Sequence, residues 1–160
     1  MSSHPDLRLG TGAWVVVCDG AKALIFENAG DAEFPDLRMQ HAEEQPDLPT
    51  RDIGTDAPGR AANSVGSARS AMEQPDYHDQ SETQFLADLA GRLDRAVQEG
   101  RARELAIVAP PRALGKLRKA LSPHVQKAVV AEVDKDLVGL PVKDIEKHLF
   151  GEKSLFSRRL

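Results

Sequence analysis

Residues 14–26 read Trp-Val-Val-Val-Cys-Asp-Gly-Ala-Lys-Ala-Leu-Ile-Phe, and this stretch decides the fold. Two apolar runs, 14–18 and 23–26, flank the pair Asp19-Gly20. Such runs around an Asp-Gly pair predict a β-hairpin, because glycine tolerates the positive φ that a tight turn needs. The chain therefore begins with two antiparallel strands.

Outward from this hairpin, the pattern alternates between strands and helices. Apolar residues recur at helical spacing from Phe85 to Val97, after a capping-box sequence at Ser81–Gln84 and before Gly100. The continuous apolar run 105–109 predicts a strand that is covered on both faces. The other predicted elements are a half-exposed strand over 37–41, a helix over about 112–121, a strand over 127–133 and a helix opened by Pro141.

The predicted order, βββαβαβα, indicates an α/β fold with a mixed five-stranded sheet whose later strands are parallel. An RNase H-like or ribosomal S11/L18-like architecture fits this order. We expect a polar leader over 1–12, a single domain over 13–150 and a tail over 151–160. Residues 42–78 are rich in Pro, Gly, Asp and Ser and show little periodicity, so we expect them to form a mobile insertion.

Composition narrows the class of protein. The chain has 160 residues, of which 41% are hydrophobic, as in an ordinary globular domain. Its apolar runs are too short to cross a bilayer, and residues 1–11 lack the apolar region of a secretory signal. The single cysteine, Cys18, excludes an intramolecular disulfide. We therefore expect a cytoplasmic protein without membrane contact.

Charge is distributed unevenly. Residues 31–79 contain eleven acidic and four basic residues, a local charge of −7. Residues 101–160 contain thirteen basic and seven acidic residues, a local charge of +6. One interpretation is a solvated surface with no further meaning; the other is a basic patch for a polyanion, with an acidic segment that opposes nonspecific binding. Both stay open at this point.

Four stretches carry a resemblance to a known family. They are Trp14–Ala23, Pro58–Arg60, Ala109–Arg118 and Asp134–Leu137. Ala-Pro-Pro-Arg-x-Leu-Gly, at the start of the third stretch, is the most specific motif. On these residues the chain resembles, over about 14–150, the bacterial family named "protein required for attachment to host cells". That family is similar to the middle domain of archaeo-eukaryotic peptide release factors and to their bacterial relatives.

The resemblance implies work at or near the ribosome, and an indirect part in host-cell attachment. Release factors use a Gly-Gly-Gln loop to hydrolyse peptidyl-tRNA, and this sequence has no Gly-Gly pair. The family's Arg-His pair appears here as Arg69-Ser70. We therefore expect a noncatalytic module that binds RNA or the ribosome, with Arg60 and Arg69 as candidates in the insertion. One alternative is a protein–protein interaction module that takes part in host-cell attachment indirectly. No cofactor and no DNA specificity are expected, and a homo-oligomer stays open.

A second group of candidates follows the strands. If the strands over 14–18, 105–109 and 127–133 are parallel, their carboxyl ends share one edge of the sheet, where open α/β sheets bind ligands. That edge would hold the candidate catalytic residues Asp19, Asp134 and Asp136, either for a hydrolase acting on a phosphorylated or acyl substrate or as an RNase H-like carboxylate cluster. Local turn roles for the three acids are the alternative. Lys135 would repel a cation there, so no metal is expected.

The predicted helix after Pro111 is amphipathic. Leu114, Leu117 and Leu121 fall on one face. The opposite face carries Arg112, Lys116 and Lys119, and three bases on one stripe can follow a phosphate backbone. Together with Lys135 they are the candidate anion- or RNA-binding residues, and an ordinary solvated face is the alternative.

Overall fold

The computed structural model describes residues 7–45 and 64–151, with side chains for 7–45 and 78–151. It contains a five-stranded sheet and, in these residues, four helices. The strands are β1 (Trp14–Cys18), β2 (Lys22–Asn28), β3 (Leu37–Glu44), β4 (Leu105–Ala109) and β5 (Val129–Asp134). The helices are α2 (Ser64–Gln98), α3 (Pro111–Ala120), α4 (Pro123–Ala128) and α5 (Val142–Phe150).

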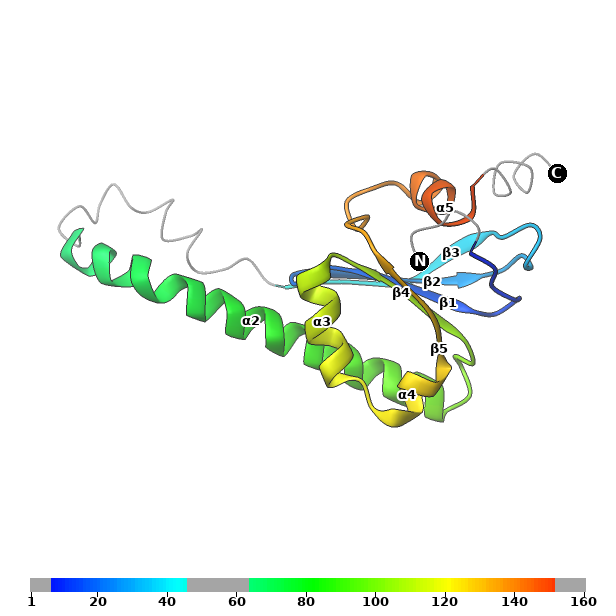
Figure 1. Ribbon diagram of the computed structural model, residues 1–160, viewed down its shortest axis with the longest axis horizontal. Coiled ribbons are helices and arrows are strands. Elements are labelled where there is room, and N and C mark those ends of the chain that lie inside the picture. The colour runs from blue at the N-terminus through cyan, green and yellow to red at the C-terminus, as the bar shows by residue number, and fades with distance from the viewer. Residues whose placement is uncertain (1–6, 46–63, 152–160) are drawn as a thin grey trace.

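The strands lie in the order β3-β2-β1-β4-β5 (Figure 1). β2 runs antiparallel to both of its neighbours, whereas β1, β4 and β5 are mutually parallel. The mixed five-stranded α/β sheet is therefore confirmed, with β1 at its centre. The strand directions expected from the predicted order βββαβαβα, which fits an RNase H-like architecture, agree with those of this sheet.

Helices cover both faces of the sheet (Figure 1). Alternate residues of β1 point to opposite sides, so that Val16 and Cys18 pack with α2 and α3 while Val15 and Val17 pack with α5. Every residue of β1 and β4 is buried. This double burial explains why both strands read as unbroken apolar runs.

Two buried polar side chains fasten the ends of β2 and β3. The Asn28 side-chain amide donates to the carbonyl of Leu9 at 3.0 Å, and its oxygen accepts from the backbone N–H of Asp36 at 2.9 Å. On α5, the fully buried Glu146 accepts the N–H of Leu37 at 2.7 Å. Because a buried polar group without a partner is costly, these contacts fix how α5 sits on the sheet.

The start of α2 corrects the sequence prediction. The helix begins at Ser64, not at Ser81, and it continues through Pro75. Strand β3 likewise extends to Glu44, so both ends of the expected insertion 42–78 have regular structure. Residues 46–63, which include Arg60, lie outside the described residues. The mobility of the insertion stays a prediction. The expected domain limits stay a prediction as well.

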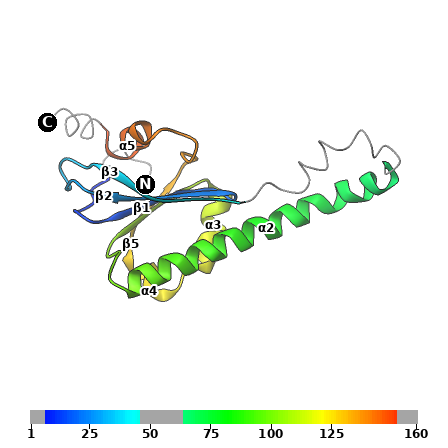
Figure 2. The ribbon, with the colours of Figure 1, turned by 180° about the vertical axis from the view of Figure 1, so that it is seen from behind.

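The position of α2 explains why the apolar pattern of the sequence did not predict the first part of this helix. Its later part packs on the sheet, whereas its earlier part extends past the sheet (Figures 1 and 2). A helical segment that extends past a sheet needs no apolar stripe to pack on that sheet. Its end agrees with the prediction, because Gly100 has a φ of +79° directly after the last turn.

A short helix was missed before the last strand. α4 occupies residues 123–128, so β5 begins at Val129 instead of residue 127. Ser122 caps this helix by accepting the N–H of Val125 at 3.3 Å, and Pro123 fills its first position. Six residues are too few to show a helical period.

Both edge strands are irregular. The pairing of β5 with β4 skips Val130, and the pairing of β3 with β2 skips Gln40. Such bulges twist an edge strand and discourage pairing with another sheet.

Among the described residues, no helix is both long enough and apolar enough to cross a membrane.

Leu117 is fully buried and holds α3 against the sheet. We predict that Leu117→Ala lowers the free energy of unfolding by about 2–5 kcal/mol, because it removes buried methyl groups and leaves a cavity. Urea unfolding followed by circular dichroism measures this loss. The control Lys119→Ala, an exposed position on the same helix, should change stability by less than about 0.5 kcal/mol; equal losses would contradict the placement of α3.

Candidate functional site

The predicted strand-end edge exists. Val17 pairs with Val108, and Ala109 pairs with Asp134, so the carboxyl ends of β1, β4 and β5 lie side by side. Asp19 follows β1, and Pro110 follows β4 into α3. The edge therefore assembles the three segments that the sequence placed there.

The three candidate carboxylates are not gathered into a metal-binding group. Asp19 Oδ1 accepts the N–H groups of Ala21 and Lys22, each at 2.8 Å, and so closes the β1–β2 turn. Asp134 and Asp136 are exposed. Within the described residues, no three His, Cys, Asp or Glu side chains come together as metal ligands. A catalytic role for Asp19, Asp134 and Asp136 stays a prediction.

Cys18, one residue before Asp19, is buried in β1. Burial, with a smaller contribution from the charge of Asp19, raises the pKa of the Cys18 thiol to about 12. A thiol with so high a pKa is not a nucleophile at neutral pH. Cys18 acts as a small core residue.

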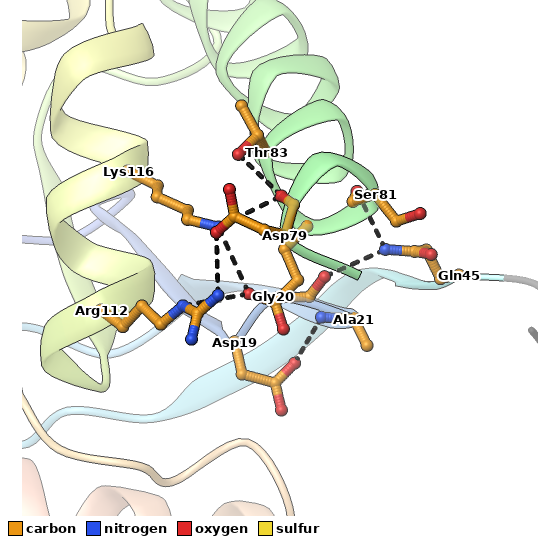
Figure 3. A network of polar contacts seen from close by, with 10 residues as sticks. Asp19, Gly20, Ala21, Gln45, Asp79, Ser81, Thr83, Arg112 and Lys116 are labelled. Carbon is orange, nitrogen blue, oxygen red and sulfur yellow. Dashed lines mark hydrogen bonds and ion pairs between the residues drawn. The ribbon is translucent and has the colours of Figure 1, made fainter. Parts of the chain in front are cut away.

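Helix α3 places its apolar and basic faces as predicted. Ala113, Leu114 and Leu117 are buried. Arg112 and Lys116, which lie one turn apart, reach α2 (Figure 3). Lys119 is exposed. The predicted stripe is therefore divided: two of its bases are engaged within the protein and one faces solvent.

Four charged groups form what we call the junction cluster: Asp79 and Glu82 of α2, and Arg112 and Lys116 of α3 (Figure 3). Asp79 Oδ1 accepts from Lys116 Nζ at 2.5 Å and from Arg112 Nη2 at 2.8 Å. Lys116 Nζ also donates to the backbone carbonyl of Asp79 at 3.2 Å. Glu82 Oε1 lies 3.4 Å from Lys116 Nζ and 3.5 Å from Arg112 Nε. Two positive and two negative charges leave the cluster formally neutral.

These contacts change the acidity of Asp79. Hydrogen bonds from Lys116 first, and from Arg112 second, lower the pKa of its carboxyl group. Because the pKa is lower in the folded state, Asp79 stabilises the fold above its unfolded pKa of about 3.9. That contribution is lost as the pH falls through the lower pKa of the folded state.

The β1–β2 turn contacts α2 beside the junction cluster. Gln45 Nε2 donates to the carbonyls of Gly20 and Ser81, each at 3.1 Å, and so joins the end of β3 to the turn and to α2 (Figure 3). Gly20 does not have a positive φ, which corrects the reason given for it above. A Cβ atom at Gly20 would lie 2.6 Å from Glu82 Cγ. The side chain of Glu82 on α2 therefore occupies the space that a larger residue at position 20 would need.

The other predicted residues are spread out. Lys135 follows β5 at the same sheet edge and is half-buried. Arg69 lies in α2. Sequence reasoning missed Asp79, Glu82 and Gln45 as partners of α3 and the turn. The only signal was the opposite charge of the segments 31–79 and 101–160, which meet where Asp79 contacts α3.

Fold and site together define an open-sheet α/β domain whose strand-end edge is flanked by a charged helix–helix junction. The model of a family described as bacterial archaeo-eukaryotic release factor family 12 matches residues 12–149. The chain belongs to that family. This match supports the release-factor part of the resemblance and gives no support to the host-attachment name. Comparison with curated proteins gave no match.

We predict that Lys116→Met raises the pKa of Asp79 toward its usual value, because the variant removes the strongest hydrogen bond to that carboxylate. Carboxyl-carbon NMR titration between about pH 2 and 6 measures the pKa. Lys119→Met removes the same charge from an exposed position on the same helix and serves as the control. An equal shift of Asp79 in both variants would show that overall charge, and not the contact, lowers the pKa.

Gly20 and Gly91 offer a matched pair. Gly20→Ala must displace Glu82 or the turn, so we predict a loss of about 1–3 kcal/mol in unfolding free energy. Gly91→Ala on α2 meets no atom within 4 Å and should stabilise the helix by about 0.5–1 kcal/mol. Thermal or urea unfolding of both variants tests the close approach, and a neutral Gly20→Ala would refute it.

Proposed function

We propose that this chain is a noncatalytic, translation-related module that binds RNA at the ribosome in the cytoplasm. The observation that carries the proposal is the family match over residues 12–149, combined with a sequence that has no Gly-Gly pair. A domain of this family that lacks the hydrolytic loop of release factors retains the means to bind but not that chemistry. An effect on host-cell attachment would then be indirect, through translation.

The shape of the molecule supports a large partner. At 1.5 Å per residue the 35 residues of α2 span about 52 Å. Figures 1 and 2 show its earlier part extending beyond the sheet, away from α5. A projecting helix increases the reach of a small domain over an extended surface.

The exposed basic side chains support binding to a polyanion. Lys119 on α3 and Lys127 on α4 are exposed on the same side of the sheet as α2. Phosphate contacts are sequence-independent and act at long range at low salt, so a few exposed bases are enough for a first encounter. No observation in the described residues favours the hydrolase or the protein–protein module over this function.

We predict that the protein co-sediments with ribosomes, and that the bound fraction falls steeply between about 50 and 200 mM salt. Lys119→Glu should weaken this binding and reduce the slope of log K against log salt by about one or more, because a phosphate contact is lost. Lys143→Glu, the same reversal at an exposed position of α5 on the opposite face of the sheet, is the control.

Two results would overturn the proposal. One is the absence of co-sedimentation at the lower salt concentration. The other is an equal loss of binding in the Lys119 and Lys143 variants, which would show that only net charge matters. Lys116→Glu is unsuitable as a test, because it would place a third acid beside Asp79 and Glu82.

A further inference from the structure

Two cations converge on one oxygen in the junction cluster. Arg112 Nη2 and Lys116 Nζ lie 2.8 and 2.5 Å from Asp79 Oδ1. A guanidinium and an ammonium group one helical turn apart, both directed at a single oxyanion, are the donors that proteins use for phosphate groups. The carboxylate of Asp79 therefore fills the position in which a phosphate oxygen would be bound.

The cluster is open to solvent on the side where a ligand would arrive. The side chain of Arg112 is 65% exposed and that of Asp79 is 48% exposed, whereas Lys116 is only 18% exposed. Ion pairs between exposed side chains are weak, because water and salt screen them. An RNA phosphate can therefore compete with Asp79 for the same two donors, while Lys116 stays held in place.

We propose that Arg112 and Lys116 form a binding site for a backbone phosphate of RNA, and that Asp79 occupies this site as an internal competitor in the unbound protein. The proposal rests on the proposed function and deepens it by naming the contact. Exchange requires a new side-chain rotamer at Asp79, and Glu82, whose Oε1 lies 3.4 Å from Lys116 Nζ and 3.5 Å from Arg112 Nε, must turn away from the same two donors. The backbone carbonyl of Asp79 can still accept from Lys116 at 3.2 Å, and Gln45 still holds the carbonyl of Ser81, so α2 keeps its place.

The test compares Asp79→Asn with the wild-type protein in fluorescence-anisotropy titrations against labelled poly(U) RNA at low salt. Removing the competing charge should tighten binding about fivefold, the change that corresponds to one exposed ion pair. Asp88→Asn, the same change at an exposed acid of α2 whose side chain accepts from Gln84, controls for net charge.

Arg112→Gln combined with Asp79→Asn should cancel the gain, because one of the two donors is removed. Equal affinity of Asp79→Asn and wild type, or an equal gain in Asp88→Asn, overturns the inference. Circular dichroism checks folding of each variant. Should Asp79→Asn fail to fold, NMR titration of the wild type with inorganic phosphate decides: shifts of the Arg112 Nε–H and Asp79 carboxyl signals support the site, and unchanged signals refute it.

The outcomes separate this inference from the proposed function. If RNA binding depends on Lys119 but Asp79→Asn does not raise the RNA affinity, the proposed function stands and the claim that Asp79 competes with RNA phosphate is refuted. If Asp79→Asn binds RNA and the wild type binds too weakly to detect, the claim that Asp79 competes with RNA phosphate is supported directly. Absence of binding by both proteins refutes both.

Discussion

The parallel pairing of β1 with β4 supports the rest of the structure, because these two strands are buried on both faces and connect the two cores. Parallel strands need a long crossover, and α2 provides it. Their pairing brings the end of β1 beside the start of α3. Glu82 of α2 lies beside Gly20 in the β1–β2 turn and also pairs with the bases of α3.

The direction of α2 depends on contacts of two kinds. Its later part is held by burial, since Leu86, Leu89 and Leu93 are almost fully buried against the sheet. The point at which it leaves the sheet is held by polar groups, namely the junction cluster and the bridge made by Gln45. Buried contacts resist salt and pH, whereas exposed ion pairs respond to both. The molecule thus combines a buried part that is insensitive to salt and pH with polar contacts, where α2 leaves the sheet, that are sensitive to both.

The candidate site shows what a linear pattern can and cannot indicate. Arg112 and Lys116 were found from helical periodicity, because a helix places residues i and i+4 on one face. Their partner Asp79 is separated from them by more than thirty residues. Pairing over that distance depends on the angle at which α2 crosses α3, which no local pattern contains. The acids Asp19, Asp134 and Asp136 show the converse: the sheet brings their segments to one edge, but Asp19 is used by its own turn.

The sequence by itself determined the strands, the hairpin, the parallel order and the amphipathic character of α3, because burial on one or two faces leaves a periodic record. It did not reveal the first half of α2, which begins at Ser64, extends past the sheet and carries no such record in the sequence. Only the tertiary structure decided that Gly20 makes room for Glu82, and that Arg112 and Lys116 are paired within the protein. Those facts depend on the approach of segments distant in the chain, and the packing of α2 and α3 on the sheet, together with the polar contacts at their junction, sets that approach.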